Sequence, residues 1–279
     1  MYVETEIVKS FNALADILVS YFKIDRQSTV LPMYKTGANG SNEIITKVDK
    51  EIEAICDAHL FSSFSGIPVF SEERYRQSMS LPDKGWVFVL DPIDGTFEFA
   101  NGSSDWSISI AAVHNLQPRV GLLLMPRTGL RFMARVGKGA FRNGQNLTNA
   151  CSAGVKQIGV SPRQQQEAVF QTRIRKSCLH PIPIPTLTVK IISMLLGYIS
   201  AAVYFPQEGK SANVWDYAAA VLLVTETGGK MTSLDGTSMP FKGQSIIHRG
   251  GWLATDSSCN HNELLKKIHI DSMSGAENI

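Results

Sequence analysis

The sequence predicts a mixed α/β protein built from two halves, and three observations lead to this prediction. In the first half, apolar runs follow one another with short turns between them, which is typical of an antiparallel sheet in an α+β arrangement. In the second half, helical and strand patterns alternate, as they do in α/β structures. The chain of 279 residues has 44% apolar and 19% charged residues, enough for a sizeable core. We place the boundary near residue 150, which gives an N-terminal half 1–150 and a C-terminal half 151–279.

The first half begins with two predicted helices. Residues 3–23 have apolar side chains at helical spacing, and those on the shared side are Ile7, Phe11, Leu14, Leu18 and Phe22. A glycine-rich polar loop, KTGANGSNE, follows. Thr46 and Asp49 have the spacing of a capping box and open a second helix, which runs to about His59. A short strand is expected at 67–70, ending in the acids of SEE, and GWVFVL reads as a buried strand.

The rest of the chain gives a meander and then an alternating pattern. WSISIAAVHN, RVGLLLMP and LRFMARVGKG are expected strands, with turns at NLQP and PRTG and an Asn-Gly hairpin in GAFRNGQNL. In the second half, KQIGVS is a strand, 163–176 a helix and HPIPIPT a proline-rich connection. Helix, strand, helix and strand follow through KMTSL, then a last strand, GWLATD, and a helix near 260–268.

Charge and composition exclude several classes of partner. The net charge of +2 and the lack of any run of five basic residues argue against binding of a nucleic acid polymer. The four cysteines lie far apart without a CxxC pair, so neither a zinc site nor a disulfide framework is indicated. The most apolar stretch, 191–205, is too short for a membrane span, which needs about 20 residues. We therefore expect a cytoplasmic protein without a membrane partner.

The stretch DPIDGTFEF, which follows GWVFVL, suggests a phosphate and metal site. Asp91 and Asp94 can point to one side of a tight turn, and Gly95 permits a close approach of the backbone. Thr96 then starts a short helix, whose free N–H groups and dipole favour an anion. The alternative is an ordinary turn, because Asp-Pro and Asp-Gly are common turn formers.

Further acids stand where predicted elements end or begin. Asp49 and Asp216 open helices, and Glu72 and Glu73 follow a strand. Singly, each could be a helix cap or a turn residue. Clustered carboxylates resist ionising together unless a cation neutralises them, and Mg²⁺ suits a site of a few carboxylates, waters and a phosphate. Together the acids predict the cleft of a magnesium-dependent phosphatase.

At these residues the sequence resembles a known family, the inositol monophosphatase-like magnesium-dependent phosphatases. SEE, DPIDGT and WDYAAAVLLVTETGG match its signature segments in order. ITKVD matches its N-terminal segment, and the region RVGLLLMP to ARVGKGAFRNG matches its connecting region. The resemblance covers about residues 35–256. It implies a layered αβαβα sandwich and the hydrolysis of a phosphate monoester by a metal-bound water, with two or three Mg²⁺ ions.

The resemblance also implies which residues bind the ions. Glu72, Asp91 and the carbonyl of Ile93 would hold one Mg²⁺, and Asp91, Asp94 and Asp216 would hold a second. A bound metal lowers the pKa of its water and supplies a nucleophile near neutral pH.

Around the reacting groups, the resemblance assigns three more residues. Asp49 and Thr96 would orient the nucleophilic water, with Asp49 near a third, weaker metal. The backbone N–H groups of Gly95 and Thr96 would hold the phosphate.

For the substrate, the sequence looks most like the 3'(2'),5'-bisphosphate nucleotidase branch. Glu98 and Phe99 form the DGT-x-EF pattern of that branch, whereas the inositol branch usually has an asparagine before the phenylalanine. By the same match, Thr188 and Lys190 would contact the substrate, with the lysine as a point charge for a second phosphate. The alternative for Lys190 is a helix residue that extends to the surface.

Two positions depart from that branch. The segment SPRQ stands where the branch often has SRSH, so Gln164 replaces a histidine, and Arg163 is a candidate to compensate as a substrate contact. Leu187 replaces a serine. Two other functions therefore stay open: an inositol monophosphatase or related sugar or polyol phosphatase, and an inactive binding protein of the same fold. A monomer and a homodimer are both compatible with the sequence.

Overall fold

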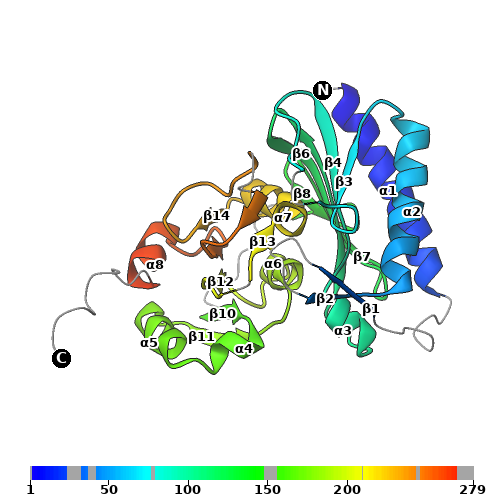
Figure 1. Cartoon of the computed structure of the whole chain (residues 1–279). Helices are drawn as coiled ribbons and strands as arrows, with labels where there is room; N and C mark the ends of the chain where they lie inside the picture. Colours follow the sequence, from blue (N-terminus) through cyan, green and yellow to red (C-terminus); the bar gives the residue numbers. More distant parts are fainter. Residues whose placement is uncertain are drawn as a thin grey trace.

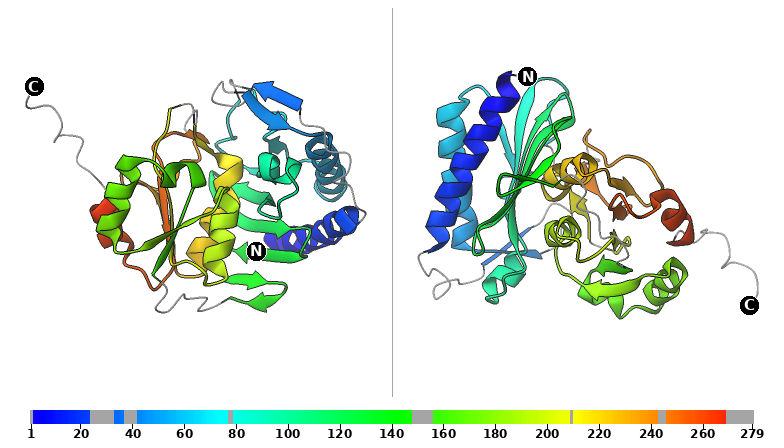
Figure 2. Two further views of the ribbon diagram at one scale, coloured as in Figure 1. Left: turned by 90° about the horizontal axis from the view of Figure 1, so that it is seen from below. Right: turned by 180° about the vertical axis from the view of Figure 1, so that it is seen from behind.

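The computed structural model describes residues 2–23, 33–36, 42–76, 79–147, 156–208, 210–242 and 246–268. Figure 1 shows five layers, in which helices and sheets alternate across the molecule. The two further views in Figure 2 agree that a middle layer of helices separates two sheets. This arrangement confirms the predicted α/β class and the αβαβα sandwich.

The first two layers are a helix pair and a seven-stranded sheet. Helices α1 (Tyr2–Lys23) and α2 (Lys47–Ser63) pack on one face of the sheet. The apolar side chains predicted for α1 are buried, except the half-buried Phe22. The strands, in spatial order, are β3 (Val69–Ser71), β4 (Trp86–Asp94), β5 (Ser107–His114), β6 (Gln117–Met125), β7 (Leu130–Arg135), β8 (Ala140–Arg142) and β9 (Gln145–Asn146).

The pairing in this sheet explains how the aspartates of DPIDGT are aimed. All neighbours are antiparallel except β3 and β4, which are parallel. Asp91 pairs with Ser109 and Asp94 with Ser107, so β4 carries one extra residue between the two aspartates. Residues three apart in a regular strand point to opposite faces, and one inserted residue brings them to the same face. The β-bulge therefore places both carboxylates on one side, as predicted.

Two helices form the middle layer, α6 (Leu187–Leu195) and α7 (Val214–Glu226). α7 lies close to the first sheet, since a Cβ atom at Gly121 would stand 3.1 Å from the Cα of Ala219. At its far end, the carboxylate of Glu226 accepts hydrogen bonds from the backbone N–H groups of residues 137–139, at 2.7–3.1 Å. The helix is thus fixed along its length, with its N-terminus at the sheet edge where DPIDGT lies.

The second sheet has five strands, and helices cover its outer side. In spatial order they are β11 (His180–Pro183), β10 (Gln157–Val160), β12 (Ala201–Tyr204), β16 (Trp252–Thr255) and β14 (Lys230–Ser233). The first three run parallel to one another, and β16 is antiparallel to both β12 and β14. The outer helices are α4 (Pro162–Gln165), α5 (Ala168–Ser177) and α8 (His261–Ile268).

Several predicted elements need correction. The helix expected at 163–176 is two helices, α4 and α5. The proline-rich connection contains a strand, β11, which is possible because an edge strand tolerates prolines that cannot donate to a neighbour. The strand expected at 67–70 runs from Val69 to Ser71.

Two further strand pairs complete the described structure. β1 (Met33–Thr36) and β2 (Asn42–Ile45) flank the tip of the predicted polar loop as an antiparallel pair, and residues 37–41 at that tip lie outside the described part. β13 (Ala212–Asn213) pairs with β15 (Ile247–His248). Residues 148–155 are also outside it, so the division at residue 150 stays a prediction. Within the described ranges, no helix is both long and apolar enough to cross a bilayer.

Candidate active site

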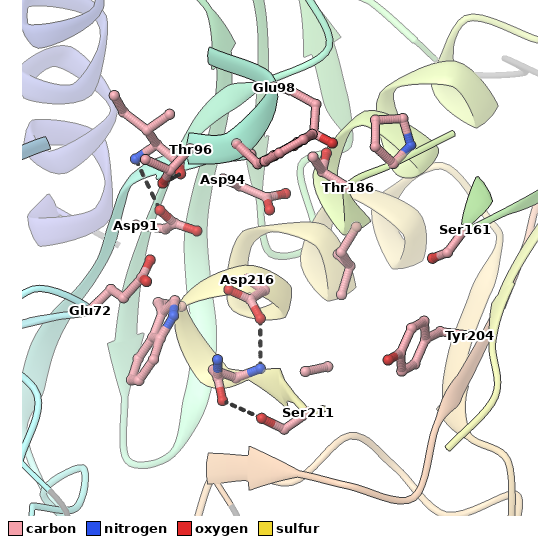
Figure 3. A pocket seen from close by; sticks show the side chains of 18 of the residues that line it. Glu72, Asp91, Asp94, Thr96, Glu98, Ser161, Thr186, Tyr204, Ser211 and Asp216 are labelled. Atoms are coloured by element: carbon pink, nitrogen blue, oxygen red, sulfur yellow. Dashed lines mark hydrogen bonds between the residues drawn. The ribbon is translucent and has the colours of Figure 1, made fainter. Parts of the chain in front are cut away.

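A cavity of about 490 Å³ lies between the two sheets, where α3 (Thr96–Ala100), α6 and the start of α7 meet. Figure 3 shows acidic side chains on one side and Ser161 and Tyr204 across from them. We call the first side the acidic wall, formed by Glu72, Asp91, Asp94 and Asp216. The facing side is the Lys190 wall, formed by Ser161, Lys190, Tyr204 and Trp252.

The two aspartates of DPIDGT are held by different neighbours. Asp91 accepts a hydrogen bond at 3.0 Å from the backbone N–H of Ile93. Asp94 accepts from the backbone N–H of Thr188 at 2.9 Å and also from its hydroxyl. The hydroxyl of Ser107 in turn donates to the Thr188 oxygen at 2.7 Å. Thr188 is completely buried, does not line the cavity, and acts on Asp94.

Asp216 reaches the cavity because it stands in the first turn of α7. Its carboxylate accepts a hydrogen bond at 2.7 Å from the backbone N–H of Asn213, which completes a capping box. The hydroxyl of Ser109 on β5 donates to the Trp215 carbonyl at 2.9 Å and ties this turn to the first sheet. The sequence predicted that Asp216 opens a helix, and the structure confirms it.

Glu72 and Glu73 share a cation that the sequence did not reveal. The ammonium group of Lys35, on β1, lies 2.8 Å from a carboxylate oxygen of Glu72 and 2.7 Å from one of Glu73. Burial lowers the pKa of Lys35, but the two carboxylates outweigh it and raise the pKa overall. Burial and the charge of Glu72 raise the pKa of Glu73 to about 7. No motif links Lys35 to acids more than 35 positions away, so only the fold could show this contact.

The carboxylates of the acidic wall repel one another. Burial is the main cause that raises the pKa of Asp91, followed by the charges of Glu72, Asp94 and Asp216. Burial also raises the pKa of Asp94, although its bonds to Thr188 lower it. Such a cluster is stabilised by added positive charge.

This donor set fits magnesium, which prefers hard oxygen ligands. In the side-chain arrangement of the described ranges, no three histidine, cysteine or acidic residues form a ready-made metal site. Each of the four carboxylates of the acidic wall accepts a hydrogen bond from the protein. A carboxylate has two oxygens and several lone pairs, so capacity for a cation is left at each.

Asp49 and Thr96 form a pair beside the acidic wall. The Thr96 hydroxyl lies 3.1 Å from a carboxylate oxygen of Asp49 and 3.1 Å from the Ile93 carbonyl oxygen. Thr46 donates to the other Asp49 oxygen from its backbone N–H, at 2.8 Å, and from its hydroxyl. Burial raises the pKa of Asp49, and the bonds from Thr46 oppose this. The structure thus brings together the two residues predicted to orient a water.

Gly95 connects β4 to α3 in a conformation that glycine allows. Its φ angle is +103°, and a Cβ atom there would stand 2.7 Å from the Cγ2 atom of Thr186. Any side chain would therefore clash as well as strain the backbone. Gly95 and Thr96 both line the cavity, as predicted for a phosphate-binding turn.

Lys190 is the most unusual residue of the facing wall. It is 1% exposed, and its ammonium group donates to the Ser161 hydroxyl at 3.1 Å and to the carbonyls of Pro185 and Thr186 at 3.4 Å. No carboxylate in the part of the chain the structure describes forms an ion pair with it. Burial lowers the pKa of Lys190 to about 8, so the charged form prevails at neutral pH.

The other predicted substrate positions are placed differently. Arg163 is exposed on α4 and does not line the cavity. Gln164 is fully buried, and its side-chain amide donates to the Phe205 carbonyl at 2.6 Å while its oxygen accepts the Phe205 N–H at 3.3 Å. Gln164 therefore joins α4 to the end of β12 and is not a pocket residue. Leu187 does line the cavity.

Comparison with known proteins gives a consistent result. The model of the inositol monophosphatase family matches residues 3–272. An inositol-1-monophosphatase of Bacillus subtilis is 27% identical, with 72% of this chain and 76% of the relative aligned. A fructose-1,6-bisphosphatase/inositol-1-monophosphatase of Thermotoga maritima is 25% identical, over 82% of this chain and 84% of the relative.

Solved structures share the fold. A dual specific IMPase/NADP phosphatase bound with D-inositol-1-phosphate superposes with a TM-score of 0.79 at 18% identity, covering 96% of this chain and 97% of that one. An IMPase/NADP phosphatase complexed with Mg²⁺ and phosphate gives 0.78 at 19% identity, with 97% of each chain covered.

Proposed function

The chain belongs to the inositol monophosphatase family, and from this premise we propose that it hydrolyses phosphate monoesters that carry a second phosphate, with 3'(2'),5'-bisphosphate nucleotides such as adenosine 3',5'-bisphosphate as the substrate class. Family membership makes the chain a Mg²⁺-dependent phosphoric monoester hydrolase. It also argues against the inactive binding protein that the sequence alone left open. A cytoplasmic location, and either a monomer or a homodimer, stay predictions.

We assign the chemistry to the acidic wall and its neighbours. Bound Mg²⁺ supplies charge for the phosphoryl oxygens and acidifies a water. We propose that the acidic wall and the Ile93 carbonyl hold the ions. Thr96 and Asp49 orient the attacking water through the hydroxyl–carboxylate contact of 3.1 Å. The N–H groups of Gly95 and Thr96, which line the cavity, would bind the phosphate, whose negative charge the start of α3 favours.

The proposal that the substrate has a second phosphate rests on Lys190. A buried ammonium that forms no ion pair is costly, and the charges of Asp94 and Glu98 offset its desolvation only in part. Its hydrogen-bond partners are a hydroxyl and two carbonyls, which are neutral. Since Lys190 lines the cavity, an anionic group of the substrate can supply the missing charge. A phosphate distant from the one being hydrolysed meets this condition.

A second candidate is an inositol or related sugar monophosphatase. The curated relatives with 25–27% identity are named for inositol 1-phosphatase activity, one together with fructose-1,6-bisphosphatase activity. In this case the substrate's hydroxyls would occupy the cavity and Lys190 would bond to a neutral group.

The experiment that separates the candidates is phosphate release from a substrate panel with Mg²⁺. The panel contains adenosine 3',5'-bisphosphate, adenosine 3'-monophosphate, inositol 1-phosphate, fructose 1,6-bisphosphate and histidinol phosphate. We expect kcat/KM for the 3',5'-bisphosphate to exceed that for the 3'-monophosphate by about tenfold to a hundredfold, the range for one charged contact.

The variant Lys190→Met should reduce this ratio toward one, because it removes the charge and keeps the apolar stem. The exposed Lys156→Met is the matched control and should keep the ratio. A wild type without preference for the bisphosphate would overturn the proposal. Preference for inositol 1-phosphate, unaffected by Lys190→Met, would establish the second candidate. Preference for fructose 1,6-bisphosphate would support a substrate with a second phosphate but would exclude a nucleotide as the substrate class.

A further inference from the structure

Glu98 is an acidic residue of the cavity to which the proposed reaction gives no role. It lies on α3, two residues after Thr96, and Figure 3 shows it on the same side of the cavity as Asp94. Each carboxylate of the acidic wall has a hydrogen-bond donor from the protein. The half-buried carboxylate of Glu98 accepts a hydrogen bond from its own backbone N–H, and no other described residue forms a hydrogen bond or ion pair with it.

Lys190 is a cation of the same cavity, but it does not pair with Glu98. Both side chains line the same cavity. They form no ion pair, and the ammonium of Lys190 is bonded to Ser161 and carbonyl oxygens instead. A carboxylate and an ammonium that line one cavity, neither in an ion pair among the described residues, are complementary to a ligand with a hydrogen-bond donor and an anion at separate positions.

The position of Glu98 on α3 indicates which part of the ligand it meets. The start of α3, at Gly95 and Thr96, is the proposed phosphate position, and because Glu98 lines the cavity from the same short helix, we expect it to face the part of the substrate close to the ester. An ionised carboxylate only accepts hydrogen bonds, and it repels a neighbouring phosphate. A hydroxyl on the adjacent carbon can donate to it, and such charge-assisted bonds are about twice as strong as neutral ones.

We propose that Glu98 is a specificity-determining residue, which selects substrates with a free hydroxyl on the carbon next to the phosphorylated one and rejects those with a phosphate there. Together with Lys190, it selects a donor near the ester and an anion farther away. This inference rests on the proposed reaction at this cavity. For a nucleoside 3',5'-bisphosphate, the 2'-hydroxyl is the group at Glu98 and the 5'-phosphate the group at Lys190.

The first test removes the hydroxyl from the substrate. We expect kcat/KM for adenosine 3',5'-bisphosphate to exceed that for its 2'-deoxy analogue by about tenfold or more, the range for a hydrogen bond to a charged group. Glu98→Gln, which keeps a neutral acceptor, should reduce the ratio several-fold, and Glu98→Ala should bring it to about one. Thermal unfolding checks that both variants fold.

The matched control is Asp105→Asn. Asp105 is exposed, affects the pKa of Glu98 through its charge and does not line the cavity. Its variant removes the same charge from the same region and should keep the wild-type ratio. If Glu98 only stabilised α3, its variants would lower kcat/KM equally for both substrates and leave the ratio unchanged, which would overturn the inference.

A second substrate pair separates this inference from the proposed function. Glycerol 2-phosphate has hydroxyls on the carbons next to the ester, isopropyl phosphate has none, and neither has a second phosphate. If the wild type does not prefer bisphosphate nucleotides but prefers glycerol 2-phosphate through Glu98, the nucleotide assignment fails and the role of Glu98 stands. Equal kcat/KM for the two members of both pairs would overturn the role of Glu98 whatever the natural substrate.

Discussion

The two walls of the cavity differ in how their charged groups are supported. Each carboxylate of the acidic wall has a hydrogen-bond donor from the protein, contributed by Lys35, Ile93, Thr188 or Asn213. Across the cavity, Lys190 has only neutral hydrogen-bond partners, and the hydroxyl of Tyr204, at the end of β12, donates to the side chain of Gln207 at 3.2 Å. The acidic wall is thus fixed in position and has an excess of negative charge. The Lys190 wall is also fixed in position, but its ammonium group has no anionic partner in an ion pair.

This difference separates the wall that we assign to catalysis from the wall that we assign to substrate preference. Repulsion within the acidic wall is relieved by cations, which are the same whatever the substrate. The unmatched charge of Lys190 is relieved by part of the substrate itself. Changes in the acidic wall should therefore affect all substrates alike, and changes in the Lys190 wall should affect the preference among them.

The largest expected effect is that of Asp94→Asn. It removes one charge from the proposed ion-binding set, and we expect kcat/KM to fall by about 1,000-fold or more on every substrate. The fold should persist, because the amide oxygen can still accept from Thr188. Without Mg²⁺ the melting temperature should be equal or higher, since repulsion is reduced. Phosphate release and thermal unfolding with and without Mg²⁺ measure both effects, and activity within tenfold of wild type would contradict the assignment.

A smaller uniform loss is expected for Thr188→Val. The variant keeps the branched shape but removes the hydroxyl between Ser107 and Asp94. The buried Ser107 hydroxyl then loses its acceptor, and an unpaired buried hydroxyl costs about 1–3 kcal/mol of unfolding free energy. We expect kcat/KM to fall about tenfold on all substrates, with Thr188→Ser close to wild type. A change in substrate preference would instead support the direct substrate contact that the sequence predicted for Thr188.

Sequence reasoning identified the acidic wall because its residues stand in short motifs. Asp91, Asp94 and Gly95 lie within five positions, and their spacing carries the turn chemistry that the bulge in β4 produces. The contact of Asp49 with Thr96 follows from two such motifs meeting. Local chemistry, read from residue types, was sufficient for these residues, and it also predicted most helices and strands.

Contacts between segments that are distant in the sequence could not be predicted from short motifs. Lys35 on β1 pairs with Glu72, which is 37 positions away, and Thr188 on α6 bonds to Asp94 and does not line the cavity. Gln164 appeared as the loss of a pocket histidine, but its side chain bonds to the Phe205 backbone. In each case the residue type allowed two partners, and the packing of elements decided between them.

On the Lys190 wall, Ser161→Ala should have an effect of about threefold. The variant removes the hydroxyl that accepts from the Lys190 ammonium at 3.1 Å, and water from the cavity can replace that bond in part. We expect a higher KM for adenosine 3',5'-bisphosphate with kcat nearly unchanged, and no change for monophosphates. An equal loss on monophosphates would show that Ser161 belongs with the general chemistry and not with selection.

His261 lies outside both walls and should affect stability alone. It lies on α8, with its ring nitrogens 2.9 Å from the Thr232 hydroxyl and 3.0 Å from the Thr255 hydroxyl. Burial lowers the pKa of His261 to about 4 from an ordinary value of 6.5. The unfolded chain therefore binds a proton more readily, so the contribution of His261 to stability is full above pH 6.5 and is lost as pH falls toward 4.

Glu73, near the acidic wall, changes stability with pH in the opposite direction from His261. The pKa of Glu73 is raised to about 7, so in metal-free protein its protonation favours the folded state as pH falls. Comparing wild type with His261→Gln, which cannot become charged, isolates the histidine from these groups. Urea unfolding in EDTA should show the stability of wild type relative to the variant falling by about 1.5 kcal/mol between pH 7 and pH 5. A difference independent of pH would contradict the assignment, and kcat/KM with Mg²⁺ at pH 7 should be the same for both proteins because His261 does not line the cavity.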